Sequence, residues 1–70
     1  MRVIDINGKE RVIESIYKIF HDIPSAISDE IIKVPYIEVI VKGGQSTWTE
    51  WWPFEDFKEK NPGMLVKLKP

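Results

Sequence analysis

The apolar residues of this chain are mostly β-branched, and this limits the folds that are open to it. Alanine occurs once, at Ala26, and leucine occurs twice, at Leu65 and Leu68, whereas isoleucine and valine are abundant. Alanine and leucine favour helices, while β-branched side chains lose freedom in a helix and pack well on a pleated sheet. The composition therefore predicts a mainly β protein.

Length, charge and cysteine content set further bounds. The 70 residues predict a single domain, residues 1–70, with a small core. There is no cysteine, so neither a disulfide nor a thiolate metal ligand can stabilise it. The net charge of −1 comes from interspersed acidic and basic residues, which disfavours a general nucleic-acid binder. Because no segment has a transmembrane or signal-peptide pattern, we expect a cytoplasmic protein.

The first third of the chain predicts a hairpin with an ambiguous second arm. Asn7-Gly8 follows the apolar residues of segment 3–6 and is a strong hairpin signal. Residues 9–23 carry apolar side chains at a spacing typical of a helix, although these side chains are β-branched or aromatic. We interpret the segment as a bent strand, because the turn needs a partner strand. A helix over residues 9–22 is the alternative.

The middle of the chain predicts a loop and then a central hairpin. Residues 24–35 begin and end with proline and predict a loop, with a short extended piece at 31–34. Residues 36–42 alternate between two faces and predict a strand. Gly43-Gly44 predicts a tight turn, and residues 46–52 return as the partner strand.

The end of the chain predicts a short helix and a last strand. Residues 53–60 suit a helix, because Pro53 fits the first helical position and acidic residues precede basic ones. Asn61-Pro62-Gly63 ends this helix. Residues 64–69 are predicted to form the last strand, with Met64, Val66 and Leu68 facing inward.

The three tryptophans are predicted to divide between the two faces of the sheet. A two-residue turn at Gly43-Gly44 pairs Trp48 with Val39 and Trp51 with Tyr36. Trp48 and Trp52 then join Val39 and Val41 in the core, and Trp51 lies outside. Glu50 falls on the inward face, so we expect it at the open end of the sheet, where water reaches it. A three-residue turn would reverse these faces.

The order of these elements resembles that of SH3-like small β-barrels. In those folds a helical turn joins the fourth and fifth strands, and residues 51–68 are similar to that part in layout. The resemblance implies a small barrel with a short helix before the last strand, and it implies no binding residues. The alternative is an α+β fold with a helix at about 9–22 packed on an antiparallel sheet. The chain also looks like uncharacterised proteins of phages and mobile elements, a likeness without a function.

No group of residues predicts an active site. His21, the single histidine, is next to Asp22, but neighbouring residues of a strand point to opposite faces. The carboxylates are densest at Glu55, Asp56 and Glu59, where an acidic first turn of a helix explains them. The serines have no adjacent base, and no metal-ligand spacing occurs. The chain is therefore predicted to be no enzyme and to hold no metal or cofactor.

An aromatic surface is the remaining functional feature. Trp51, Tyr36, Ile40 and Thr49 are predicted to share the outer face, an amphipathic surface of the kind found at binding hot spots. We expect a small interaction module that binds a protein or peptide through this face, or forms a homodimer.

The alternative hypothesis is a nucleic-acid-binding small barrel. In this interpretation the rings of Trp51 and Tyr36 stack on bases, and Lys33 and Lys42 lie near them.

Overall fold

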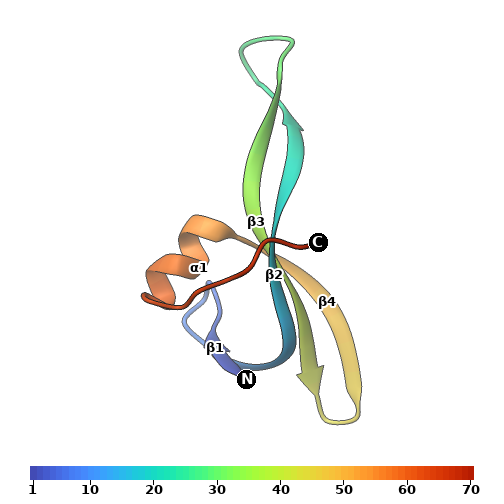
Figure 1. Cartoon of the computed structure of the whole chain (residues 1–70), viewed down its shortest axis with the longest axis vertical. Helices are drawn as coiled ribbons and strands as arrows, with labels where there is room; N and C mark the ends of the chain where they lie inside the picture. The colour runs from blue at the N-terminus through green and yellow to red at the C-terminus, as the bar shows by residue number, and fades with distance from the viewer.

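The computed structural model describes residues 1–70 as one antiparallel sheet followed by a short helix (Figure 1). The elements are β1 (Arg2–Ile4), β2 (Glu10–Pro24), β3 (Ile31–Gly43), β4 (Ser46–Pro53) and α1 (Phe54–Lys60). The strands lie in the sheet in chain order, β1-β2-β3-β4, and every pair is antiparallel. The protein is mainly β, as its composition predicts.

Residues 9–23 are extended, and a bulge explains why their apolar spacing imitates a helix. Ile13 pairs with Val41 and Ile16 pairs with Val39, with an irregularity between Ile13 and Ser15. Val39 and Val41 share one face of β3, so Ile13 and Ile16 also share a face although they are three residues apart. The predicted bent strand is confirmed, and the alternative helix over residues 9–22 is wrong.

The first hairpin turns at Asn7-Gly8 as predicted, through a three-residue loop. The backbone N–H of Gly8 donates to the carbonyl of Asp5 at 3.0 Å, and the N–H of Asp5 donates to the carbonyl of Lys9 at 2.8 Å. Gly8 has a φ of 80°, the left-handed conformation that glycine adopts at little cost. A turn followed by such a glycine is the usual three-residue hairpin loop.

The second hairpin turns one residue later than predicted. Gly43 pairs with Ser46, so the turn residues are Gly44, with a φ of 60°, and Gln45. The pairing moves with it: Trp48 lies opposite Val41 and Trp51 lies opposite Glu38. The predicted partners were wrong by two positions on β3, and an even shift leaves every side chain on its predicted face.

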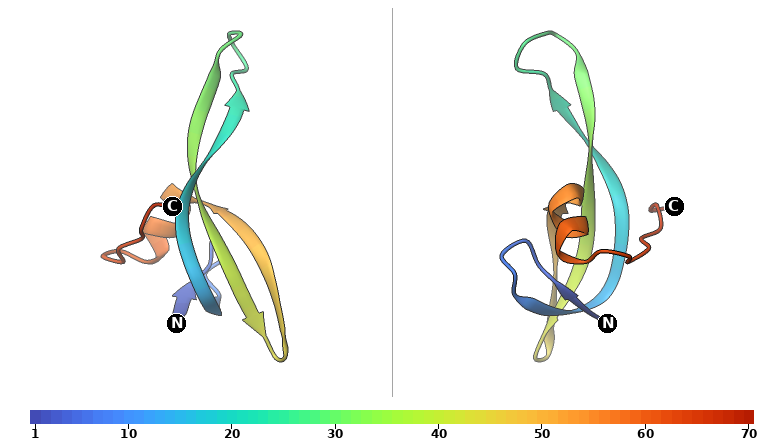
Figure 2. Two further views of the ribbon diagram at one scale, coloured as in Figure 1. Left: turned by 45° about the vertical axis from the view of Figure 1, so that its right-hand side comes forward. Right: turned by 90° about the vertical axis from the view of Figure 1, so that its left-hand side faces the viewer.

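The core lies on one side of the sheet, which we call the inner face. Its buried members come from all four strands and the helix: Val3, Ile13, Ile37, Val39, Val41, Trp52 and Phe57. Phe54, Met64 and Val66 are partly buried and pack against them. Figure 2 shows the first hairpin and α1 on the same side of the sheet. The helix begins one residue after the predicted Pro53, and its two phenylalanines, Phe54 and Phe57, face the core.

A long two-stranded extension projects from the rest of the molecule (Figures 1 and 2). We call residues 20–35 the arm, because in this stretch β2 and β3 pair only with each other. The molecule measures 43 × 24 × 23 Å. The loop at the end of the arm is residues 25–30, where the N–H of Ser25 donates to the carbonyl of Glu30 at 2.9 Å.

The arm corrects the predicted loop of residues 24–35. Pro24 and Pro35 both lie within strands, opposite Ile31 and Phe20 respectively. Lys18 lies on β2 two residues before the arm. It exchanges backbone hydrogen bonds with the C-terminal segment, so its N–H and carbonyl groups point away from β3. By alternation Pro24 also points its nitrogen away from β3, and Pro35 points its nitrogen away from β2. Neither proline therefore removes a hydrogen bond from the arm.

The sheet does not close, so the predicted SH3-like barrel is wrong. A last strand at residues 64–69 would have completed it, but this segment makes a single parallel bridge, between Lys18 and Leu68. The N–H of Lys18 donates to the carbonyl of Lys67, and the N–H of Lys69 donates to the carbonyl of Lys18. Leu68, predicted to face inward, is exposed. The helix consequently follows the last strand of the sheet.

One asparagine ties the end of the helix to β1. The Oδ1 of Asn61 accepts from the N–H of Ile4 at 2.8 Å, and its Nδ2 donates to the carbonyl of Ile4 at 2.7 Å and to that of Phe57 at 3.0 Å. The Asn61 side chain thus bonds both backbone groups of Ile4, as a neighbouring strand would on that edge of β1. It therefore holds the first hairpin against α1 and over the core.

Candidate interaction face

The four predicted binding residues lie together on the side of the sheet opposite the core. Tyr36 and Ile40 alternate with the buried Ile37 and Val39 on β3, and Thr49 pairs with Ile40. Trp51 is two residues further along β4, so it shares this side. We call this surface the outer face. From the pairing of β2 with β3 it also includes Tyr17 and Ile19.

Trp51 is the most prominent side chain of the outer face. It is 51 % exposed, and its indole Nε1 donates to Oε1 of Glu38 at 3.2 Å. The other oxygen of Glu38 accepts from Nζ of Lys69, which reaches over from the C-terminal segment. The hydrogen bond from Lys69 lowers the pKa of Glu38, burial opposes this, and the hydrogen bond from Trp51 lowers it further. Glu38 is therefore held as a carboxylate among aromatic side chains.

The single histidine extends the outer face toward the arm. His21 stacks on Tyr36 with ring centroids 4.3 Å apart and an angle of 24° between the planes. Asp22 points to the other side, and its carboxylate lies 3.4 Å from Nζ of Lys33. His21 and Asp22 therefore face opposite sides as predicted. The stacked rings of His21 and Tyr36 lie beside Ile19, which pairs with Tyr36 across the two strands.

The two lysines of the nucleic-acid hypothesis are on opposite sides of β3. Lys42 is an even number of residues from Tyr36 and lies on the outer face, whereas Lys33 lies on the side of the buried Ile37. The structure therefore does not bring Lys33 and Lys42 together around Trp51.

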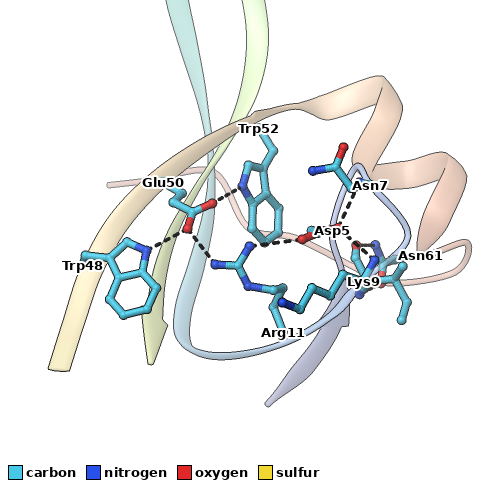
Figure 3. A network of polar contacts seen from close by, with 9 residues as sticks. Asp5, Asn7, Lys9, Arg11, Trp48, Glu50, Trp52 and Asn61 are labelled. Atoms are coloured by element: carbon cyan, nitrogen blue, oxygen red, sulfur yellow. Dashed lines mark hydrogen bonds and ion pairs between the residues drawn. The ribbon is translucent and has the colours of Figure 1, made fainter. Parts of the chain in front are cut away.

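The inner face carries a polar network that the sequence did not predict (Figure 3). Three side chains converge on the carboxylate of Glu50. Trp48 Nε1 donates to Oε2 at 2.7 Å, Trp52 Nε1 donates to Oε1 at 3.0 Å, and Arg11 Nη2 lies 2.7 Å from Oε2. Glu50 does face inward, as predicted, and it is satisfied by these donors.

Arg11 links Glu50 to a second carboxylate, that of the buried Asp5. Arg11 Nη1 lies 3.1 Å from Oδ2 of Asp5, while Oδ1 accepts from the backbone N–H groups of Asn7 and Lys9, both at 2.9 Å. Asp5 thereby holds the turn of the first hairpin and orients the guanidinium. We call Asp5, Arg11, Trp48, Glu50 and Trp52 the Glu50 network.

The network keeps both carboxylates ionised. The hydrogen bond from Trp48 lowers the pKa of Glu50, burial raises it, and the donors Trp52 and Arg11 lower it further, so the pKa lies below its ordinary value. Burial raises the pKa of Asp5, but the hydrogen bonds from Lys9, Arg11 and Asn7 outweigh it and leave this pKa lowered as well. Because every member has a partner within the molecule, we interpret the network as structural.

The predicted division of the tryptophans is partly wrong. Trp52 is 4 % exposed and packs in the core, and Trp51 is outside, as predicted. Trp48 shares the face of Trp52 but is 43 % exposed. It lies near the start of β4, next to the turn of the second hairpin. There it pairs with Val41, and its ring packs against Gly43. Neither α1 nor the first hairpin extends over this end, so facing inward does not bury Trp48.

The signal for the Glu50 network was present in the sequence. Glu50 lies two residues from Trp48 and two from Trp52, so a strand places all three side chains on one face. A carboxylate there needs donors, and indole N–H groups are donors. The choice of Arg11 as the third donor depends on how the first hairpin folds over the sheet, which a local pattern does not contain.

The structure offers no enclosed site. It has no pocket, and no group of three or more potential ligands is arranged to hold a metal ion. The single helix, α1, has seven residues and is too short to be a membrane-spanning helix. Comparisons of the chain with protein-family models, with curated proteins and with solved structures found no match.

Proposed function

We propose that this protein is a small non-catalytic interaction module that binds a protein or peptide through the outer face of its sheet. The observation that supports this most directly is Trp51, a large side chain that is half exposed on a sheet face with no layer of structure over it. A sheet covered on one side normally presents polar side chains on the other. Here the outer face presents Tyr17, Ile19, Tyr36 and Ile40 together with Trp51.

The chemistry of the outer face suits an extended or flat protein segment. Tyrosine and tryptophan provide large apolar area with few rotatable bonds, and they are enriched among residues that dominate binding energy. Glu38 adds one carboxylate, whose present partner is Lys69 of the same chain. A basic side chain of a partner would take the place of Lys69, stack beside the ring of Trp51 and be held by the carboxylate.

The test is a selection of displayed peptides against the immobilised protein. Binding peptides should lose affinity at least about tenfold with Trp51→Ala, the loss expected for a half-buried aromatic anchor. Trp48→Ala is the matched control, because Trp48 is exposed to a similar degree on the inner side. Peptides that lose affinity equally with both variants would contradict the outer face as the site.

Salt dependence separates this function from nucleic-acid binding. Peptide binding through aromatic side chains should change little between low and physiological salt. Tight binding of single-stranded RNA with a steep loss of affinity as salt rises would instead support nucleic acid as the ligand.

A further inference from the structure

The free edge of β4 is open along most of its length. β4 is the last strand of the sheet and pairs only with β3. Gly43 and Ser46 flank a two-residue turn, so they form a hydrogen-bonded pair. The bonding direction alternates along a strand. Starting with Thr47, every second residue therefore points its N–H and carbonyl groups away from β3. These outward residues are Thr47, Thr49 and Trp51.

This edge has only one of the features by which proteins protect sheet edges. Natural edges are blocked by lysine, proline, bulges, inward-pointing charges or a covering segment. On β4 the only charged side chain is Glu50, which faces inward and is held by the Glu50 network. Proline comes only at the end of the strand, at Pro53. The pairing with β3 runs from Gly43 to Tyr36 without an irregularity.

The other edges of the sheet are covered or interrupted at several positions. The free edge of β3 in the arm is interrupted by Pro35, whose nitrogen points outward and carries no hydrogen. The free edge of β2 is occupied by β1 near its start and by Lys67 and Lys69 at Lys18. In the arm each free edge has two outward residues before a proline, whereas β4 has three in succession.

We propose that β4 pairs antiparallel with β4 of a second copy of this chain, across a two-fold axis that passes beside Thr49. In this arrangement Thr49 faces Thr49 of the second copy, and Thr47 faces Trp51 in both directions. All three outward residues find a partner, giving about six backbone hydrogen bonds. The two sheets join into one.

Side-chain complementarity favours this register over its neighbours. On the inner side it places Trp48, whose indole donates to Glu50 of its own chain, opposite Glu50 of the second copy, so the two Glu50 carboxylates do not face each other. If the pairing shifts by two residues so that Thr49 faces Trp51, Glu50 faces Glu50 of the second copy, which is a repulsive pair. A shift in the other direction moves Trp51 opposite the turn at Gln45, where no strand partner remains. The net charge of −1 per copy adds little repulsion.

The pairing concerns the backbone of β4, so it goes beyond the proposed function and does not depend on it. The side chains of Thr49 and Trp51 stay on the outer face when the edges join. Two outer faces would then form one longer surface across the axis.

The first test is sedimentation equilibrium over a range of protein concentrations. The wild type should form a dimer, and Thr49→Pro should weaken it about tenfold or more, because it removes an outward N–H from each copy. Thr49→Ala is the matched control: it loses the same side chain but keeps the N–H, and it should dimerise as the wild type does. A thermal melt and a circular dichroism spectrum check that each variant is folded.

Two results would overturn the proposal. One is a wild type that stays monomeric up to about 1 mM, a concentration at which even a weak pairing is half formed. The other is a dimer that folded Thr49→Pro leaves intact or that Thr49→Ala disrupts to the same extent. A monomer that still binds selected peptides through Trp51 overturns the dimer alone, and a dimer that binds none overturns the proposed function alone.

A cysteine cross-link tests the register even if the proline variant fails to fold. The chain has no cysteine, so one thiol can be placed at will. Facing residues in a hydrogen-bonded pair have Cα atoms about 5.5 Å apart, within the range of a disulfide. Thr49→Cys should therefore form covalent dimers readily. In Thr47→Cys the thiols lie about 13 Å apart along the strands and should cross-link far more slowly. Equal rates would overturn the register.

Discussion

The same two strands, β2 and β3, pass through two regions of very different character. Where the first hairpin and α1 cover the inner face, which we call the covered end, Ile37 and Val39 are completely buried. In the arm, Ile31 is 67 % exposed, and Ile27 in its loop is 96 % exposed. The sequence is equally rich in isoleucine in both. Burial in this protein is therefore decided by which part of the sheet receives a second layer.

The two regions also differ in how their polar groups are satisfied. At the covered end the Glu50 network and Asn61 connect β4, the first hairpin and α1 through side chains. In the arm one exposed ion pair, between Asp22 and Lys33, accompanies the backbone pairing. A two-stranded ribbon without a packed face is marginally stable by itself. We therefore expect the free energy of unfolding to come almost wholly from the covered end.

The largest effect should come from a phenylalanine of the core compared with one of the arm. Phe57 is completely buried and stacks on Trp52, with ring centroids 6.1 Å apart. Phe57→Ala should lower the free energy of unfolding by about 3–5 kcal/mol, measured by urea titration. Phe20→Ala in the arm should lower it by less than about 1 kcal/mol. Similar losses would mean that the arm packs on something in solution.

The next effect concerns the Glu50 network. Glu50→Gln replaces one acceptor oxygen by a donor amide that faces donors, so we expect a loss of about 1–3 kcal/mol at neutral pH. The matched control is Glu10→Gln, which breaks the exposed pair of Glu10 with Arg2 and should cost at most about 0.5 kcal/mol. Equal losses in the two variants would show that the network adds no more than a surface pair.

The same network should set the acid sensitivity of the fold. The pKa of Glu50 is lowered in the folded protein from its ordinary value of 4.5. Its contribution is therefore fully present above pH 4.5 and is lost as the pH falls through the lower folded pKa. Denaturant titrations from pH 7 downward should show wild-type stability falling in this range. Glu50→Gln should fall less steeply, retaining the parts due to Asp5 and Glu38, whose pKa values are also lowered. Parallel curves would contradict this assignment.

A smaller effect is expected at the exposed tryptophan of the inner side. Trp48 loses contact with Gly43 and its hydrogen bond to Glu50 when replaced by alanine, so Trp48→Ala should cost about 1–2 kcal/mol. Trp52→Ala, in the core, should cost about 3–5 kcal/mol. Thermal melts of the two variants compare them directly. A Trp48 variant as unstable as the Trp52 variant would show that Trp48 is covered in solution by more than the contacts within its own chain.

Local signals in the sequence were enough to predict the elements that depend on local chemistry. Asn7-Gly8 and the glycines at 43–44 both marked hairpins, because a turn needs residues that tolerate positive φ. The acidic-to-basic order within residues 53–60 marked the helix. Scarce alanine and leucine correctly favoured a strand over a helix for residues 9–23. The face of each tryptophan followed from simple alternation.

Features that depend on distant parts of the chain were not predictable in this way. Whether the sheet closes depends on where the segment after α1 returns, and it meets β2 only at Lys18. The exposure of Trp48 depends on how far α1 and the first hairpin extend over the sheet. Pro24 and Pro35 can lie within strands because their nitrogens point to the sides of the arm that have no partner strand, and the sequence does not show which sides these are. Each is set by packing between elements, which residue spacing does not record.

The smallest effect should come from removing most of the arm, and it tests the comparison most directly. His21 and Val34 form a hydrogen-bonded pair, because the adjacent pair of Phe20 and Pro35 points its backbone outward. Replacing residues 22–33 by Asn-Gly therefore joins His21 to Val34 through a two-residue turn that suits the twist of the strands. The shortened protein should unfold within about 1 kcal/mol of the wild type, because the removed residues bury little surface. It should still bind peptides selected through Trp51, since that residue pairs with Glu38 far from the cut. A loss of several kcal/mol would mean that the arm supports the covered end, and the two regions would then be one cooperative unit.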